Sequence, residues 1–125
     1  MKAKTAQQKK YESLSRRKGR VRSRISGTIE RPRLVVNKSN RYTVAAVVDD
    51  VKGVTLISLS TIKVKADKYQ DNFKKVADAH ALGKKIAEIV KEKKIIKVVF
   101  DRGGNRYTGR VRAVAEGARE QGLEF

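Results

Sequence analysis

The chain has 125 residues, no cysteine, and 31 Lys and Arg against 13 Asp and Glu, for a formal net charge of +18. This length suits one compact domain; the missing cysteines exclude disulfides, thiolate metal sites and cysteine nucleophiles, and no segment approaches the roughly 18 apolar residues of a membrane span. The charge indicates a polyanionic partner, most commonly nucleic acid, because an isolated protein gains nothing from such self-repulsion.

Residues 1–27 form the first predicted unit, a basic arm with few large apolar residues. The charge is concentrated near this end: residues 1–41 hold 14 Lys and Arg and two acids, or +12 of the +18. The run AQQKKYESLSRRK contains helix formers, but like charges crowd one another, so an isolated helix there is marginal. We expect an arm, flexible or partly helical, that orders on its partner, followed by a globular domain at residues 28–125.

Three runs rich in β-branched residues follow the arm and predict strands. They are RLVVN (33–37), YTVAAVVD (42–49) and VTLISLST (54–61). The connections KSNR and DVKG are short and turn-like, which favours an antiparallel meander.

The second half of the chain changes period. From Asp71, apolar residues recur at three- and four-residue spacing and predict an amphipathic helix ending near Lys94, with His80 on its apolar face as a packed core histidine. The run IIKVVF (95–100) is typical of a strand buried on both faces, and a last helix ends at a C′ cap, Gly122. The order arm-β-β-β-α-β-α indicates an α/β (α+β) fold with a mixed, mostly antiparallel sheet and helices packed on it.

The stretch FDRGGNRYTGRV (100–111) predicts an anion-binding loop between the last strand and the last helix. Gly103 and Gly104 permit positive φ and a close approach by phosphate, and a helix start adds positive potential. First turns favour acids, yet this one carries Arg110 and Arg112. The alternative is a double-glycine turn with solvated arginines; the basic arm favours nucleic acid.

Two segments carry a resemblance to a known family. RPRLVVNKSNRYTVAAVVDD and FDRGGNRYTGRVRAVAEGAREQGLEF resemble large-ribosomal-subunit protein eighteen of bacteria, and the resemblance covers about residues 13–125. It implies a non-enzymatic cytoplasmic ribosomal protein that binds 5S rRNA, helps attach it to the central protuberance of the large subunit, and lays its arm along RNA. It also implies large-subunit rRNA and neighbouring ribosomal proteins as partners, with no cofactor, membrane or small-molecule substrate.

The matching positions can be assigned one by one. The first signature is matched by Arg33, Ser39, Asn40, Ala45, Val47 and Asp49, and the second by Phe100, Asp101, Arg102, Gly103, Gly104, Tyr107, Gly109, Arg110 and Val111. The family often has histidine at Tyr42 and at Thr108, tyrosine at Val44 and glutamine at Ala46. Tyr42 can still stack on RNA and Thr108 can cap the helix, whereas Val44 and Ala46 offer RNA no polar side chain.

The predicted RNA-binding set combines the arm, the first turn of the meander and the loop. It comprises Lys9, Lys10, Arg16, Arg17, Lys18, Arg20, Arg22, Arg24, Arg31, Arg33, Lys38, Ser39, Asn40, Arg41, Tyr42, Arg102, Gly103, Gly104, Asn105, Arg106, Tyr107, Thr108, Gly109 and Arg110.

Two other functions are open to a basic chain of this kind. Asp49, Asp50 and Asp101 lie at strand ends, where a nuclease could hold Mg²⁺, but no base, nucleophile and orienting group can be assembled, so we expect a turn opener at Asp49–Asp50 and an arginine partner or loop cap at Asp101. A protein that binds DNA or another structured RNA is the second alternative; no helix-turn-helix or zinc-finger pattern supports it. We predict no catalytic and no metal-binding residue.

Overall fold

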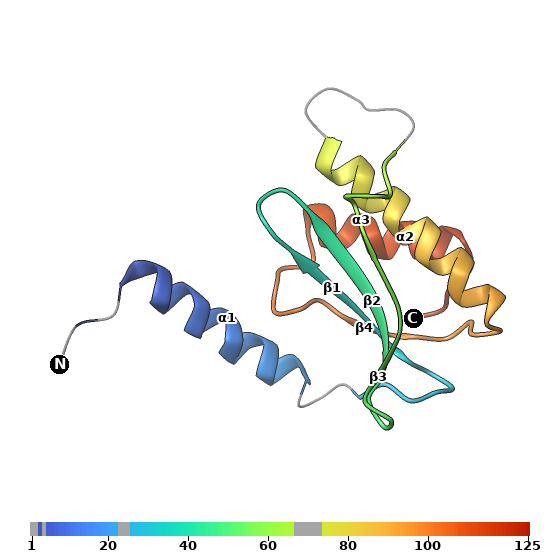
Figure 1. Ribbon diagram of the computed structural model, residues 1–125, viewed down its shortest axis with the longest axis horizontal. Coiled ribbons are helices and arrows are strands. Elements are labelled where there is room, and N and C mark those ends of the chain that lie inside the picture. Colours follow the sequence, from blue (N-terminus) through green and yellow to red (C-terminus); the bar gives the residue numbers. More distant parts are fainter. Residues whose placement is uncertain (1–2, 4, 23–25, 67–73) are drawn as a thin grey trace.

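The computed structural model describes residue 3 and residues 5–22, 26–66 and 74–125. Its elements, in chain order, are α1 (Ala6–Arg22), β1 (Arg33–Lys38), β2 (Thr43–Asp49), β3 (Val54–Ser60), α2 (Lys74–Glu92), β4 (Val99–Asp101) and α3 (Gly109–Glu120) (Figure 1). The predicted order of elements is therefore confirmed. The predicted start of the long helix, at residues 71–73, lies outside the described residues.

The strands form one mixed sheet in the order β3-β2-β1-β4. β1 pairs antiparallel with β2, and β2 with β3, as the meander prediction requires. β4 runs parallel to β1, with Leu34 opposite Phe100. Neighbouring parallel strands have their carboxyl ends at the same end of the sheet. The segments that follow β1 and β4 therefore emerge side by side.

One face of the sheet is covered by α2 and α3 (Figure 1). Alternate strand residues point into this core and are completely buried, while the residues between them are only half buried on the opposite face. The core-facing strand residues are Leu34, Val36, Ala45 and Val47, and the half-buried ones are Val35, Val44, Ala46 and Val48. This period of two is what a sheet covered on one side requires.

Two glycines let α2 and α3 pack with their backbones in contact. A Cβ added at Gly83 would lie 2.1 Å from the carbonyl oxygen of Val114, and one at Gly117 would lie 2.3 Å from that of His80. At each crossing, the backbone of one helix occupies the space in which the other helix would carry a side chain. Only glycine therefore fits at these two positions.

The prediction of a strand buried on both faces at residues 95–100 is wrong. Strand β4 begins only at Val99 and lies at the edge of the sheet, and Ile96 is 50% exposed. Within this run only Val98 is fully buried. An apolar run reports hydrophobicity but not how many faces of the strand are covered, and α2 and α3 cover one face of this sheet.

His80 is not the packed core histidine that the apolar stripe predicts. Its side chain is one third exposed at the rim between the helices, and Nε2 lies 3.0 Å from Oε2 of Glu120 on α3. The hydrogen bond from His80 is the main cause that lowers the pKa of the exposed Glu120 carboxyl. His80 therefore links α2 to α3 through its polar edge.

The helix ends show the local signals that stop and start them. Gly122 has a φ of +100° and follows α3 in a Schellman arrangement, in which the amide of Leu123 donates to the carbonyl of Ala118; the predicted C′ cap is confirmed. In the arm, Thr5 and Gln8 donate their backbone amides to each other's side-chain oxygens, a capping box before α1.

The helix crossing generates a stability prediction. Gly83→Ala places a methyl group against backbone that has no room to move, so it should lower the free energy of unfolding by about 1–3 kcal/mol in urea denaturation. Gly19→Ala is the matched control, because nothing lies within 4 Å of a Cβ there and alanine favours a helix. Equal stability of the two variants would contradict the backbone contact.

Candidate nucleic-acid interface

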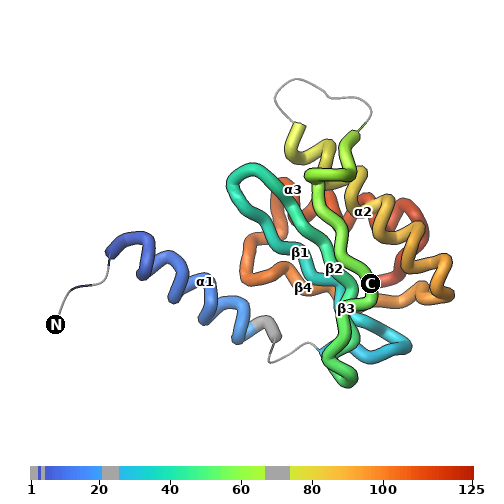
Figure 2. Tube along the Cα trace, viewed as in Figure 1, coloured from blue at the N-terminus to red at the C-terminus, as the bar shows by residue number. Residues whose placement is uncertain are grey.

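The arm, the β1–β2 turn and the β4–α3 loop meet at one end of the sheet, where the carboxyl ends of β1 and β4 lie. Figure 2 shows α1 extending away from the domain beside this end. The arm approaches the loop at Gly104, where an added Cβ would lie 3.1 Å from the amide nitrogen of Lys18 and 3.3 Å from Cδ1 of Leu14. The three segments predicted separately from the sequence therefore share one surface region.

The β1–β2 turn is closed by Ser39 and Tyr42 and presents its other side chains to solvent. The amide of Ser39 donates to the carbonyl of Tyr42 at 2.8 Å, and the amide of Tyr42 donates to Oγ of Ser39 at 3.1 Å. Lys38, Asn40 and Arg41 are exposed, and Tyr42 keeps 39% of its surface exposed. The side chains of this turn are therefore accessible to a partner.

The double glycine of the loop is needed for close approach, but to the protein itself. Gly103 is buried with a φ of +64°, its amide donates to Oδ1 of Asp101, and an added Cβ would lie 2.4 Å from the carbonyl oxygen of Val36 in β1. Gly104 faces the arm. The prediction that Gly103 admits a phosphate is therefore corrected, since strand β1 occupies that space, whereas Gly104 stays half buried beside the arm. Gly109, with a φ of +55° and nothing within 4 Å, is the open glycine.

Arg33 is a structural residue and not a free cation. It is 7% exposed, and its guanidinium donates to both oxygens of Asp50 (2.9 and 3.0 Å) and to Oδ2 of Asp101 (2.8 Å). The hydrogen bond to Asp50 is the main cause that raises the pKa of Arg33, against the opposing effect of burial. The prediction that Arg33 contacts RNA is corrected on this basis, and the expected arginine partner and loop cap at Asp101 are both confirmed.

The same network reaches the end of the arm. Oδ2 of Asp50 also accepts the amide of Gly27 at 2.7 Å, and the amide of Asp50 donates to the carbonyl of Gly27. One guanidinium thus connects the end of the arm, the β2–β3 turn and the start of the β4–α3 loop.

Two cations from the helices bind the backbone of the β1–β2 turn. Nη1 of Arg110 donates to the carbonyl of Ser39 at 2.7 Å and to that of Tyr42 at 3.4 Å. Nζ of Lys75 donates to the carbonyl of Asn40. The sequence alone does not point to Lys75, because its helix is far from the turn in the chain. Both cations hold the turn and raise the positive potential around it.

Tyr107 is committed to an aromatic cluster rather than free to stack on a base. Its ring lies edge-on to Phe100 at 5.9 Å between centroids, and Phe100 stacks on Phe125 at 5.4 Å. Arg119 lies over the Phe125 ring at 4.4 Å and donates to the Tyr107 hydroxyl at 3.2 Å. The predicted RNA contact of Tyr107 is therefore corrected: its side chain supports the loop from within the fold.

Two neighbouring grooves run between the arm and the domain. The first, here called the arm groove, is lined by Lys10, Tyr11, Leu14, Arg17, Lys38, Ser39, Asn40, Asn105 and Arg110. The second, here called the loop groove, is lined by Arg17, Lys38, Arg102, Gly104, Asn105, Arg106 and Thr108. Among the residues that the structure describes, no acidic one lines either groove. Tyr11 and Leu14 are absent from the predicted set, because no sequence signal shows which side of α1 faces the domain.

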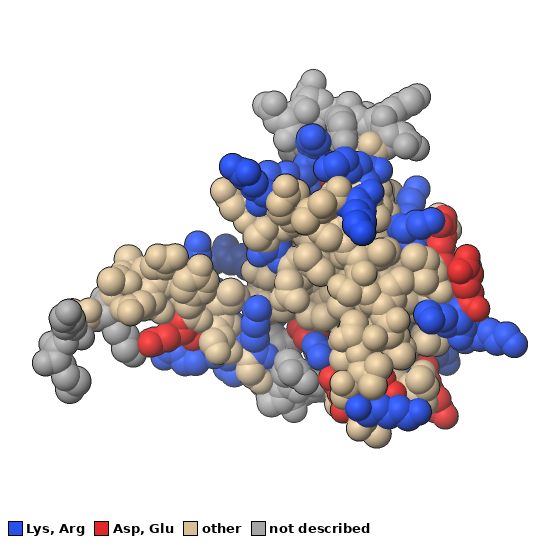
Figure 3. Space-filling model, in the orientation of Figure 1, with Lys and Arg blue, Asp and Glu red and all other residues tan. Residues whose placement is uncertain are grey.

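Several of the remaining predicted residues lie outside the grooves. Lys9, Arg16 and Arg20 are exposed along α1, Lys18 is half buried against the loop, and the backbone of Arg22 ends the helix; Arg24 lies outside the described residues. Arg31 is exposed in the turn before β1. Thr108 occupies the N-cap position of α3, yet its side chain makes no capping hydrogen bond, so the expected cap is not formed. Figure 3 shows basic side chains along α1 and near its approach to the domain, and a nearly uncharged centre over the strands.

The carboxylates considered for metal binding are engaged with protein donors. Oδ1 of Asp49 accepts the amide of Val51 at 3.0 Å, which confirms the turn opener, and Asp50 and Asp101 bind Arg33. Within the described ranges, no group of three or more His, Cys, Asp or Glu residues could hold a metal ion. Nor is any helix there long and apolar enough to cross a membrane.

Comparison with known proteins shows which family this chain resembles. A family model for ribosomal L18 of archaea, bacteria, mitochondria and chloroplasts matches residues 8–125. A protein of Nitratidesulfovibrio vulgaris (strain DP4) named large ribosomal subunit protein uL18 is 51% identical over 116 residues, covering 93% of this chain and 97% of its own. Its namesake in Bifidobacterium animalis subsp. lactis (strain AD011) is 54% identical over 114 residues, 91% of each chain. The resemblance drawn from the two signature segments is confirmed.

The Arg33 network generates the prediction of this section. Arg33→Met leaves the Asp50 and Asp101 carboxylates buried without their partner, so it should cost about 3–5 kcal/mol of unfolding free energy in urea denaturation. Arg31→Met removes an exposed guanidinium two residues away and should change stability by no more than about 0.5 kcal/mol. If both variants unfold alike, the network does not hold the fold.

Proposed function

We infer the function of this chain from the premise that it belongs to the ribosomal L18 family. It is a structural, non-enzymatic protein of the large ribosomal subunit that binds rRNA alongside other ribosomal proteins and acts in translation on the cytoplasmic ribosome.

Within that role, we propose that the chain binds 5S rRNA and helps attach it to the central protuberance of the large subunit. The observation that carries the proposal is the pair of grooves between α1 and the domain, which are lined by cations from three segments and by no acid. Surfaces of this kind bind the phosphate backbone of a nucleic acid. The RNA lies along this end of the sheet, between arm and loop.

The two predicted units have different roles in this proposal. Residues 1–27 act as a basic arm that lies along RNA, and residues 28–125 act as the globular domain that presents the turn and the loop. The open start of α3, with Gly109 exposed and no acid in the first turn, offers its positive end to a phosphate.

The proposed contact residues are the predicted ones that the structure leaves accessible. Arg33, Gly103 and Tyr107 are withdrawn, because they are occupied within the protein. The proposed set is Lys9, Lys10, Arg16, Arg17, Lys18, Arg20, Arg31, Lys38, Ser39, Asn40, Arg41, Tyr42, Arg102, Gly104, Asn105, Arg106, Thr108, Gly109 and Arg110, together with Arg22 and Arg24 as sequence-based members.

A protein that binds duplex DNA or another structured RNA is the remaining alternative. Competition distinguishes them: 5S rRNA should displace a labelled 5S rRNA far better than an equal mass of duplex DNA or of an unrelated folded RNA. Equal competition by all three would overturn the 5S assignment and leave a general polyanion binder.

The salt dependence of binding tests the role of the arm. Changing Arg16, Arg17, Lys18 and Arg20 to Gln should weaken 5S rRNA binding and flatten the slope of log affinity against log salt, because fewer counterions are released. The matched control changes Lys52, Lys85, Lys93 and Lys97 to Gln, with the same loss of charge away from the grooves. A slope that falls equally in both variants would show that only net charge matters.

Arg110 tests the turn and loop together. Arg110→Glu should strongly weaken 5S rRNA binding, because it reverses a charge that lines the arm groove. Its effect on stability should be small: a hydrogen bond to exposed carbonyls is lost, at about 0.5–1.5 kcal/mol, while an acid suits the first turn of α3, at about 0.3–1 kcal/mol. A large loss of unfolding free energy with unchanged affinity would make Arg110 purely structural.

A further inference from the structure

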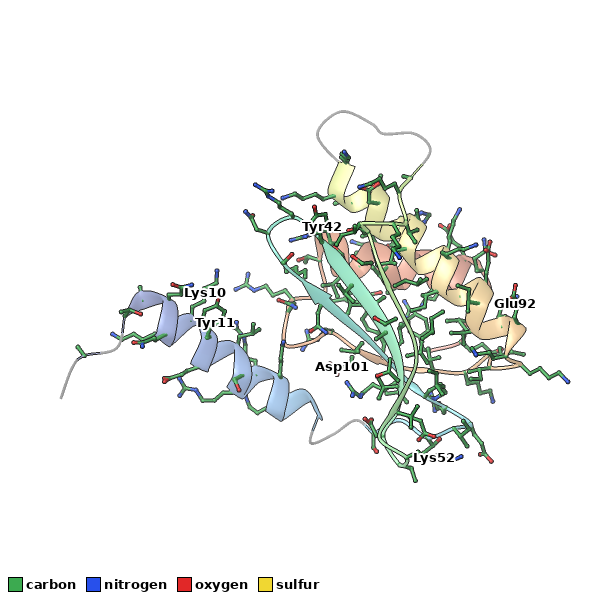
Figure 4. All side chains as sticks on the ribbon, viewed as in Figure 1. Lys10, Tyr11, Tyr42, Lys52, Glu92 and Asp101 are labelled. Atoms are coloured by element: carbon green, nitrogen blue, oxygen red, sulfur yellow. The ribbon has the colours of Figure 1, made fainter. Side chains whose placement is uncertain are left out.

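The arm groove contains an exposed aromatic ring that phosphate binding does not explain. Tyr11 lies on α1 with 61% of its surface exposed, and Leu14, one turn further on, lines the same groove and contacts the loop at Gly104. Figure 4 shows Lys10 and Tyr11 on the side of α1 that faces the domain. A flat apolar surface therefore forms one wall of a groove whose rim is cationic.

The opposite wall consists of short polar side chains. Ser39 and Asn40 come from the β1–β2 turn and Asn105 from the loop. Nδ2 of the Asn105 side chain donates to the carbonyls of Arg102 and Gly103 at 3.3 and 3.4 Å, and these hydrogen bonds orient the side chain. The Ser39 hydroxyl is engaged with Tyr42, so the side-chain amides of Asn40 and Asn105 are the groups offered to the edge of a nucleobase.

Four cations also line the arm groove, beside its aromatic wall and its polar wall. Lys10 and Arg17 lie on the arm side, and Lys38 and Arg110 on the domain side. Among the described residues, the hydrogen bonds of Arg110 use Nη1, and none involves its Nε or Nη2. Phosphates on either side of a bound base would meet these donors.

We propose that the arm groove binds one unpaired nucleotide of the RNA, with its base stacked on Tyr11 and its flanking phosphates on Lys10 and Arg17. The proposal rests on the proposed function, and it adds a class of ligand to it: a base outside a helix. A duplex hides the faces of its bases, so its backbone would use the cations and leave Tyr11 without a partner. An unstacked base uses the aromatic face, the amide edge and the cations together.

The test compares three full-length variants for binding to a bacterial 5S rRNA over a range of salt concentrations. Tyr11→Ala should lower affinity by about 5- to 150-fold and leave the salt slope unchanged, because stacking releases no counterions. Tyr11→Phe, which keeps the ring, should bind within about threefold of the original chain. Lys10→Gln should flatten the slope. Helicity measured by circular dichroism serves as the folding control, since alanine favours α1.

The outcomes separate the nucleotide site from the proposed function. Wild-type affinity in Tyr11→Ala, or a flattened slope like that of Lys10→Gln, would overturn the nucleotide site while leaving 5S binding intact. A second probe, a single-stranded uridine oligonucleotide, covers the other case. If the original chain fails to prefer 5S rRNA, yet Tyr11→Ala still loses and Tyr11→Phe retains oligonucleotide binding, the 5S assignment fails and the nucleotide site stands.

Discussion

A single buried guanidinium holds together the parts of this protein that the proposed interface needs. Arg33 binds Asp50, which holds the backbone of Gly27 at the end of the arm, and Asp101, which holds the first turn of the β4–α3 loop. Removing one partner from a buried ion pair leaves an uncompensated charge, so the three groups depend on one another. The directions in which arm and loop leave the sheet are therefore coupled through one side chain.

The sheet topology then determines where binding can occur. Because β1 and β4 are parallel, their following segments share one end of the sheet, and α1 lies beside it. Arg110 and Lys75 bind the carbonyls of the β1–β2 turn and bring their charges to that end. The centre of the open sheet face is nearly uncharged in Figure 3, and Lys and Arg side chains lie around it.

Much of the fold was predictable, because period and turn chemistry are local. The runs 33–37, 42–49 and 54–61 became β1, β2 and β3 within one residue at each end, and Gly122 caps α3 as expected. The errors concern neighbours. The apolar run at residues 95–100 predicts a strand covered on both faces, but its strand β4 lies at the edge of the sheet. His80 follows the apolar period of α2, yet it contacts Glu120 at the rim.

By itself, the sequence determined the charge, the basic arm, the order of elements and the family, since all of these depend on composition and on residues close together in the chain. Only the tertiary structure decided which cations are available. Arg33 and Arg102 look alike in sequence, but Arg33 is buried against Asp101, 68 residues away, and Arg102 is exposed in the loop groove. The two tyrosines differ in the same way: the Tyr107 ring is partly buried against Phe100, whereas Tyr11 is 61% exposed.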